Sequence, residues 1–351
     1  MADTSLWSAV RIGAIYAGTV IGAGFASGQE LLQFFAAYGG SGLAGAALAG
    51  GLMAWLGATM LHLGRRIRAA GYQDLIYRLC GPHAGAVLAF AIVLFLFCCL
   101  AIMLAGMATI GRDYFGCPYL FCLAGAALLA ALTVLGGMRG ITIANIAVTP
   151  LLAAAVAGVA AAAIVHHLPG PELLAVPAPG ISPPVPWWPL AAFLYVSYNV
   201  ALSATVLAPL GSGSPRRAAR TLGGIIGGLT IAVLAVLGTA AILLHLPAAL
   251  EQELPVLYIA GLQEYHGRPF LAIILLAAMY TTAIASLYGC AAKLAIAARS
   301  GFTLTVLTAA AAAAAAGVLG FSFLVGTVFP LFGWVTALFT ARLVWYAVSG
   351  R

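Results

Sequence analysis

Residues 21–30 read IGAGFASGQE, and they interrupt an apolar stretch that extends from Leu6 to Tyr38. Three glycines, a serine, a glutamine and a glutamate stand where a simple membrane anchor would carry leucine and valine. Glycine destabilises a regular helix and lets another backbone approach closely. An unwound segment inside lipid needs protein, water or a ligand to satisfy its backbone groups. We therefore expect a discontinuous helix whose free backbone groups bind another part of the protein, water or a ligand.

The composition places the chain among membrane proteins. Its 351 residues are 64% hydrophobic and 7% charged, with a mean hydropathy of +1.11, whereas a soluble domain is about a quarter charged. The apolar runs are much longer than the roughly 10 residues of an outer-membrane strand, so helices are expected. The net charge of +7 comes from basic residues scattered between these runs. This pattern fits membrane orientation and indicates no nucleic-acid partner.

The apolar runs predict an all-α protein with ten transmembrane helices, because each is close to or above the ~20 residues that cross a bilayer. The first and the sixth are expected to be discontinuous. The predicted spans are 8–37, 41–63, 84–110, 118–136, 141–167, 187–210, 219–245, 268–297, 302–319 and 321–348.

The distribution of basic residues supports this number of spans. With the N-terminus inside, 13 of the 15 basic residues fall on the inside, and only Arg112 and Arg268 fall outside. Removing one span would reverse every later loop and destroy this asymmetry. We therefore expect a multi-pass protein of the bacterial cytoplasmic membrane with both termini in the cytoplasm. The inside residues are Arg11, Arg65, Arg66, Arg68, Arg78, Arg139, Arg216, Arg217, Arg220, Lys293, Arg299, Arg342 and Arg351.

The spans divide into two halves of opposite orientation within one membrane domain. Residues 1–168 form the first five-helix repeat, residues 187–351 form the second, and residues 169–186 form an extracellular linker. Breaks at corresponding positions of inverted halves indicate the binding site of a transporter.

A second polar interruption lies five spans after the first. The triplet Ser197, Tyr198 and Asn199 stands near the middle of the sixth span. Its simpler interpretation is hydrogen bonding between helices, just as the glycines of the first span also fit close helix packing. Glu30 favours the functional interpretation, because a carboxylate at membrane depth is costly and usually marks a pathway. An interfacial position, with its carboxylate in water, is the alternative.

The run YAGTVIGAGFASGQELLQFF, residues 16–35, resembles the first span of YkvI-like bacterial membrane proteins. That family is placed in the amino acid–polyamine–organocation superfamily, whose members have the five-plus-five inverted repeat of the LeuT fold. The ten-span count and the polar sixth span agree with it. The resemblance implies this fold and a transport function, and it leaves the substrate open.

The resemblance also implies a sodium site between spans 1 and 8. Sodium-coupled members of this fold use two carbonyls of the first span with a carbonyl and two adjacent hydroxyls of the eighth. These positions fall here on Gly18, Ile21, Ala278, Thr281 and Thr282. The alternative is that the threonines bond back to their own helix. Some proton-coupled relatives carry a lysine in span 5, and residues 141–165 contain no lysine or arginine, which favours sodium.

The substrate site is expected at the two breaks. Amides at the start of the outer half-helix would face a carboxylate, while carbonyls and the polar triplet would receive an ammonium group. A zwitterionic amino acid or a small amine fits this chemistry. The candidate substrate-binding residues are Gly22, Ala23, Gly24, Phe25, Ala26, Ser27, Gly28, Phe193, Ser197, Tyr198, Asn199, Tyr280 and Ile284.

Gln29 and Glu30 follow the first break and are candidate gating or coupling residues. Glu30 has three interpretations: part of an outer gate, a counter-charge for a cationic substrate, or a carboxylate that carries a coupling proton.

We therefore predict a secondary active transporter for a small amino acid or organic amine, coupled to sodium, with the bilayer as its surroundings and no other cofactor. Proton coupling through Glu30 and a ligand sensor of the same fold, as in spore-germination proteins, remain alternatives. A channel would need polar faces along several spans, and most spans are apolar all round. An enzyme would need clustered catalytic residues, and the histidines are dispersed.

Overall fold

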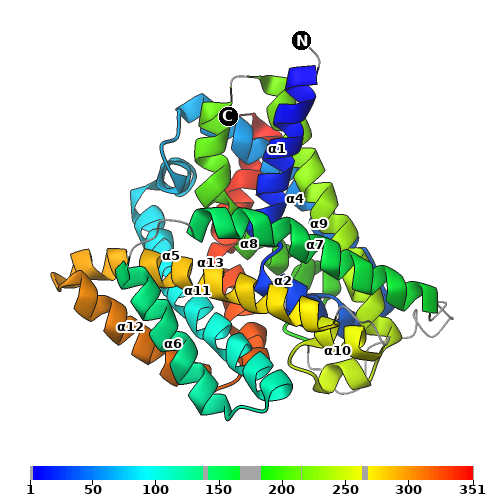
Figure 1. Ribbon diagram of the computed structural model, residues 1–351. Helices are drawn as coiled ribbons and strands as arrows, with labels where there is room; N and C mark the ends of the chain where they lie inside the picture. Colours follow the sequence, from blue (N-terminus) through cyan, green and yellow to red (C-terminus); the bar gives the residue numbers. More distant parts are fainter. Residues whose placement is uncertain (1–2, 137–140, 167–182, 215, 263–267, 351) are drawn as a thin grey trace.

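The computed structural model describes residues 3–136, 141–166, 183–214, 216–262 and 268–350, and all of its regular elements are helices. The α-helices pack into one bundle, with α8 as the most buried of the long helices that the structure describes and both termini at one end (Figure 1). The predicted linker, residues 169–186, lies outside the described residues except for 183–186. The elements are α1 (Asp3–Val20), α2 (Ala23–Ser27), α3 (Gln29–Phe34), η1 (Ala36–Tyr38), α4 (Gly40–Ile67), α5 (Tyr72–Phe115), α6 (Tyr119–Gly136), α7 (Ile141–His166), α8 (Trp188–Gly213), α9 (Arg217–Leu244), η3 (Ala248–Glu251), α10 (Pro255–Leu262), α11 (Arg268–Ala298), α12 (Phe302–Gly317) and α13 (Phe321–Ser349).

Each predicted span coincides with a helix or, in the first span, with the segments α1 to α3. Within the described residues, eight helices are long and apolar enough to cross a membrane, and α12 is a shorter apolar helix. The predicted all-α fold is therefore confirmed. The prediction for the third span missed an extra segment: α5 begins at Tyr72 and bends at Gly81, where φ is +77° and Pro82 follows.

The prediction of a discontinuous sixth span is wrong. Helix α8 runs without interruption from Trp188 to Gly213. Two members of the polar triplet bond back to their own helix: the Ser197 hydroxyl donates to the Phe193 carbonyl at 2.8 Å, and the Asn199 amide donates to the Tyr195 carbonyl at 3.0 Å. Unlike the first span, α8 contains no glycine before its last turn. These polar side chains are therefore satisfied without unwinding the backbone.

Small residues bring the helices of the two halves into close contact. A Cβ atom on Gly224 of α9 would overlap the backbone of Ala58 in α4, and a Cβ on Gly228 would overlap the backbone of Ala54. Helices in membranes associate by this kind of close packing, because lipid gives no hydrophobic drive. The glycines of α9 therefore specify how closely α4 and α9 approach.

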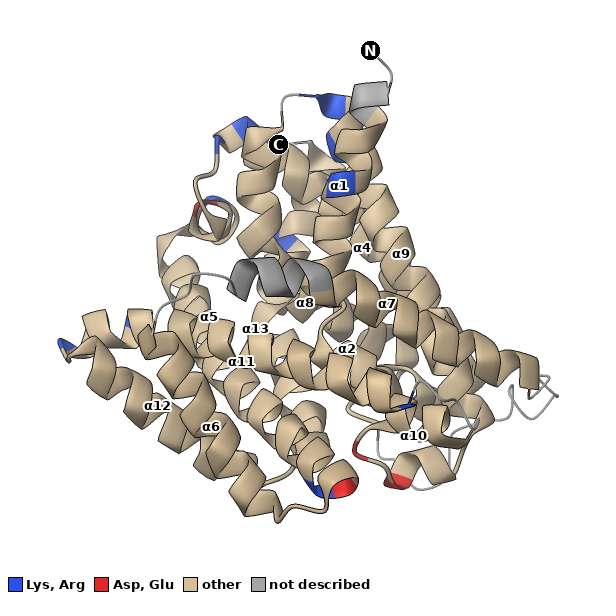
Figure 2. Ribbon diagram, viewed as in Figure 1, with Lys and Arg blue, Asp and Glu red and all other residues tan. Residues whose placement is uncertain are grey.

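Charged residues are few, and they lie mainly near the two ends of the bundle and where α11 meets α12 (Figure 2). The end that carries both termini is rich in arginine, and we call it the basic end. There the Arg65 guanidinium donates to the Ser212 carbonyl, which joins α4 to α8. The opposite end contains α10 and the adjacent acidic residues Glu251 and Glu253, and we call it the α10 end.

Candidate functional site

The first span bends after Val20, where α1 ends. Gly22 has an extended backbone (φ −98°, ψ −173°), and its amide donates to the Val20 carbonyl at 2.8 Å instead of continuing the helix. In the part of the chain that the structure describes, no backbone amide of α2 donates to a carbonyl of α1. The bend thus leaves first-turn amides of α2, including that of Gly24, and carbonyls before it available for other partners.

A second bend at Gly28 separates α2 from α3. The φ of Gly28 is +90°, a conformation that strongly favours glycine. A Cβ on Gly28 would lie 2.9 Å from Cγ2 of Val256 and 3.2 Å from its amide nitrogen, so α10 packs directly against this bend. The predicted interruption at residues 21–28 is confirmed, and it is bounded by these two bends.

Glu30 lies inside the bundle and faces the break. Its side chain is only 5% exposed, and Oε2 accepts a hydrogen bond from the Tyr198 hydroxyl of α8 at 2.6 Å. A Cβ on Gly24 would overlap the other oxygen, Oε1. The carboxylate is therefore held between the first and sixth spans, and the absence of a side chain at Gly24 makes room for it. The interfacial alternative, with this carboxylate in water, does not describe the structure.

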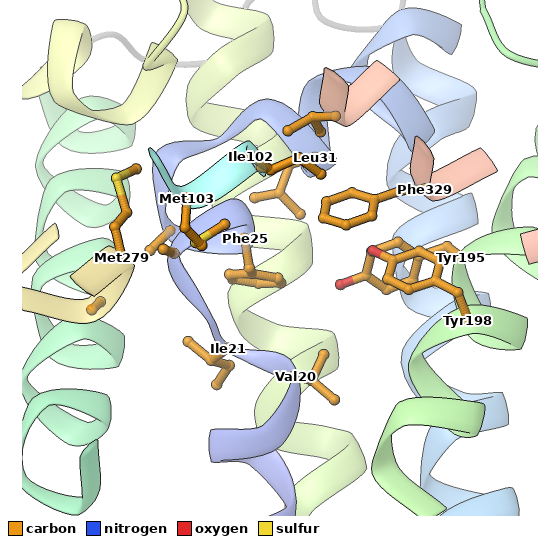
Figure 3. Close-up of a cluster of buried hydrophobic side chains, with 14 of the residues drawn as sticks. Val20, Ile21, Phe25, Leu31, Ile102, Met103, Tyr195, Tyr198, Met279 and Phe329 are labelled. Carbon is orange, nitrogen blue, oxygen red and sulfur yellow. The ribbon is translucent and has the colours of Figure 1, made fainter. Parts of the chain in front are cut away.

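Aromatic side chains surround this carboxylate contact. The ring of Tyr198 stacks on Phe329 of α13 with centroids 5.1 Å apart and an interplanar angle of 8°, and Phe34 lies 5.7 Å from Tyr198. Figure 3 shows Phe329 and Tyr198 in the same cluster of buried side chains as Phe25 of the bent first span. Sequence reasoning missed Phe329 and Tyr195. The spacing of Tyr195 and Tyr198 could have indicated one helix face, whereas no local signal marked Phe329.

Gln29 points toward the α10 end of the break. Its side-chain amide donates to the Gln252 carbonyl and to the Ser322 hydroxyl, each at 2.8 Å. These bonds connect the first span to the segment before α10 and to the start of α13. Gln29 thus joins the first span to the α10 end, and its gating role stays a prediction.

The remaining predicted substrate residues are only partly brought together. Ser27 is buried, and its hydroxyl donates to the Gly24 carbonyl at 2.7 Å. Ala23 and Ala26 are buried in α2 beside it. The Tyr280 hydroxyl shares a hydrogen bond of 2.6 Å with Thr133 of α6, so that tyrosine is directed away from the break.

Two further candidates, Phe193 and Ile284, lie on α8 and α11. Phe193 is half-buried, and its carbonyl accepts the bond from Ser197. Ile284 is buried.

The predicted sodium ligands lie on two parts of the chain, at the end of α1 with the bend that follows it and on α11. Because of the bend, no backbone amide of the described residues donates to the carbonyl of Gly18 or to that of Ile21. On α11, the Thr281 hydroxyl donates to the Ala278 carbonyl at 3.1 Å, as the alternative interpretation predicted, and Thr282 is half-buried. A hydroxyl that donates such a bond keeps lone pairs for a cation. The five residues therefore remain a candidate set.

The two sides of the break differ in accessibility. Residues 23–32 are all buried, whereas Gly18, Thr19 and Gly22 are partly exposed. A Cβ on Gly22 would meet no atom within 4 Å. The break is thus more open on the side of α1, which leads to the basic end, than on the side of α10.

Comparison with known proteins finds similar sequences and similar folds. No model of a protein family matches the chain. The chain is 26% identical over 347 residues to the uncharacterized membrane protein YkvI of Bacillus subtilis (strain 168), and the match covers 97% of each chain. This agrees with the resemblance seen in the first span.

Solved structures show the same fold at low identity. The inward-facing conformation of Mhp1 matches with a TM-score of 0.69 at 14% identity, over 96% of this chain and 76% of Mhp1. The chain has the LeuT-type transporter fold. A closed conformation of Mhp1, a nucleobase-cation-symport-1 family transporter with bromovinylhydantoin bound, matches with 0.52 at 15% identity, over 92% and 74%. MhsT in complex with L-phenylalanine matches with 0.58 at 18% identity, over 94% and 88%. These structural neighbours are membrane transporters and not enzymes.

Proposed function

We propose that the chain is a secondary active transporter that moves a small amino acid or organic amine across the membrane by alternating access, with sodium as the coupling ion. The observation that carries this proposal is the buried carboxylate of Glu30, which lies beside Gly24 at the break and accepts the hydroxyl of Tyr198. A buried carboxylate requires a charged or hydrogen-bonding partner, because burying it alone is costly. An ammonium group at the break supplies both the charge and the hydrogen bonds.

The cargo then has one cationic end and a body of limited size. The first amides of α2 point into the bend and would bind the carboxylate of an amino acid, while Glu30 binds its ammonium group. An organic amine would use Glu30 alone. Phe25, Tyr198 and Phe329 supply an apolar and aromatic wall next to these polar groups (Figure 3). The bound L-phenylalanine of MhsT supports an amino acid as cargo for this fold.

We assign the structure to an inward-facing stage of the proposed alternating access. The bonds of Gln29 and the packing of α10 on Gly28 close the α10 end, while the α1 side of the break is partly exposed. The higher TM-score with inward-facing Mhp1 than with closed Mhp1 supports the same assignment. Basic residues concentrate on the cytoplasmic side of membrane proteins. We therefore propose that the basic end, with both termini, faces the cytoplasm of a bacterial inner membrane. We also propose that the chain belongs to the amino acid–polyamine–organocation superfamily, because its sequence is similar to YkvI and its fold is of the LeuT type.

Proton coupling through Glu30 is the second candidate. The hydrogen bond from Tyr198 is the only bond to this carboxylate among the described residues, and no lysine, arginine or histidine pairs with it there. A carboxylate in such surroundings can take up a proton when the cargo leaves. A ligand sensor of the same fold would bind the same cargo without moving it.

Reconstitution distinguishes these functions. Amino acids and amines are first screened by the thermal stabilisation that they give the purified protein. Each compound that binds is then tested in proteoliposomes, where we expect uptake driven by an imposed sodium gradient and counterflow of the radiolabelled compound. Saturable binding with neither uptake nor counterflow would establish a sensor and exclude the transporter.

Sodium should stabilise the protein by a route that depends on Thr281 and Thr282. We expect sodium chloride to raise the melting temperature more than potassium or choline chloride, and Thr281→Ala or Thr282→Ala to remove this difference, because each removes one of about five or six oxygens around the ion. Thr308→Ala is the matched control, since the Thr308 hydroxyl bonds only within α12. An unchanged sodium response in both site variants would disprove this ion site.

A further inference from the structure

A cavity of about 200 Å³ lies at the basic end, far from the break along the chain. It is lined by Arg78 and Leu79 of α5 and by Arg342, Trp345 and Tyr346 of α13. A water molecule occupies about 30 Å³ of liquid volume, so the cavity can hold a group several times larger than a water. Both arginines and Trp345 are exposed, so the cavity opens to the surroundings of the protein.

Neither arginine of this cavity has a carboxylate partner within the described part of the chain. The one ion pair found there joins Arg112 to Asp113 at the other end of the bundle. Asp74, one helical turn before Arg78, instead accepts the backbone amides of Ala70 and Gly71 at 2.7 and 3.2 Å and caps the start of α5. Two arginines therefore line this cavity without a neutralising carboxylate among the described residues. Guanidinium groups bind phosphate oxygens in a bidentate manner, which lysine cannot do.

The aromatic residues of the cavity suggest where the anion comes from. Trp345 is 56% exposed, and tryptophan at the end of a membrane helix lies at the level of the lipid headgroups. Tyr346 is fixed from the other side by Arg66 of α4, whose guanidinium donates to the tyrosine hydroxyl at 3.1 Å and lies 6.0 Å from the ring centre. The cavity therefore combines unpaired cations with a rigid aromatic wall at the membrane surface.

We infer that this cavity is a binding site for the phosphate of an anionic phospholipid headgroup. The phosphate lies between Arg78 and Arg342, and the acyl chains follow the apolar surface of α13 past Trp345. Basic cavities between helix ends on the cytoplasmic side are suited to such headgroups. The site is separate from the break and does not depend on the transport function proposed above.

Native mass spectrometry of the purified protein with defined lipids tests this site. We expect the wild type to retain one phosphatidylglycerol molecule under conditions that remove phosphatidylcholine. The double variant Arg78→Gln, Arg342→Gln should bind phosphatidylglycerol about tenfold or more weakly, because it loses charge-assisted hydrogen bonds to phosphate. The matched control Arg216→Gln, Arg217→Gln removes the same charge from exposed positions at the same end and should bind like the wild type.

Three results would overturn the assignment. Equal loss of phosphatidylglycerol in the control would show that lipid binding depends on the total positive charge at this end and not on the cavity. Retention of phosphatidylcholine as strong as that of phosphatidylglycerol would show that the site does not select a negatively charged headgroup. Displacement of the lipid by millimolar inorganic phosphate would show that the cavity takes a soluble anion instead. If the double variant does not fold, the single variants Arg78→Gln and Arg342→Gln replace it, and each should weaken lipid binding more than the control does.

Discussion

Replacing Glu30 by glutamine is expected to abolish sodium-driven uptake while the protein still folds. Glutamine has nearly the same shape and still offers an oxygen to the Tyr198 hydroxyl, so the contact between α3 and α8 persists. What disappears is the negative charge beside Gly24. Removing one member of a buried charge pair costs about 2–5 kcal/mol, so binding of the ammonium group should weaken by about 30-fold or more. Uptake and counterflow in proteoliposomes measure this loss.

The same variant separates the two roles proposed for Glu30. If the carboxylate is the counter-charge for the cargo, both gradient-driven uptake and counterflow are lost. If it carries the coupling proton, counterflow persists and only uptake against a gradient is lost. Glu251→Gln, the same change at an exposed position of the α10 end, serves as the control and should transport normally. Wild-type uptake by Glu30→Gln at every pH would leave this residue without a function in transport.

Replacing Gly50 by alanine is expected to destabilise the protein strongly, whereas the same change at the neighbouring Gly51 should be harmless. A Cβ on Gly50 would overlap the Cβ of Ala232 and lie 2.5 Å from its Cα, so the backbone of α9 would have to move away from α4. A Cβ on Gly51 would meet nothing within 4 Å. Overpacking of a close contact costs about 1–3 kcal/mol and occasionally more.

The two alanine variants form a matched pair, because they lie one residue apart on the same helix. Alanine favours an exposed helix position over glycine by up to about 1 kcal/mol, so Gly51→Ala should be neutral or slightly stabilising. The measurement is the free energy of unfolding of each variant in mild detergent, from a denaturant titration, with the melting temperature as a second readout. Equal stability of the two variants would show that α4 and α9 do not approach as closely as described.

The sequence predicted the parts of the fold that depend on local composition. Apolar length and the alternation of basic residues gave the ten spans, because crossing the hydrocarbon needs a fixed length of apolar helix. The glycines at 22, 24 and 28 indicated the interruption of the first span. The same reasoning failed for α8. The side chains of Ser197 and Asn199 donate hydrogen bonds to backbone carbonyls of α8 itself, and no glycine near them weakens the helix.

The surroundings of Glu30 could not be predicted to the same degree. Its partner Tyr198 lies 168 residues away along the chain, and the stacking ring of Phe329 belongs to the last span. The sequence alone therefore determined that the chain crosses the membrane in ten spans, breaks its first helix and places a carboxylate after the break. Only the tertiary structure decided that this carboxylate turns back onto Gly24 and that Arg78 and Arg342 share one cavity. Helix length and helix breaks depend on neighbouring residues, whereas a buried charge takes its partners from whichever helices pack around it.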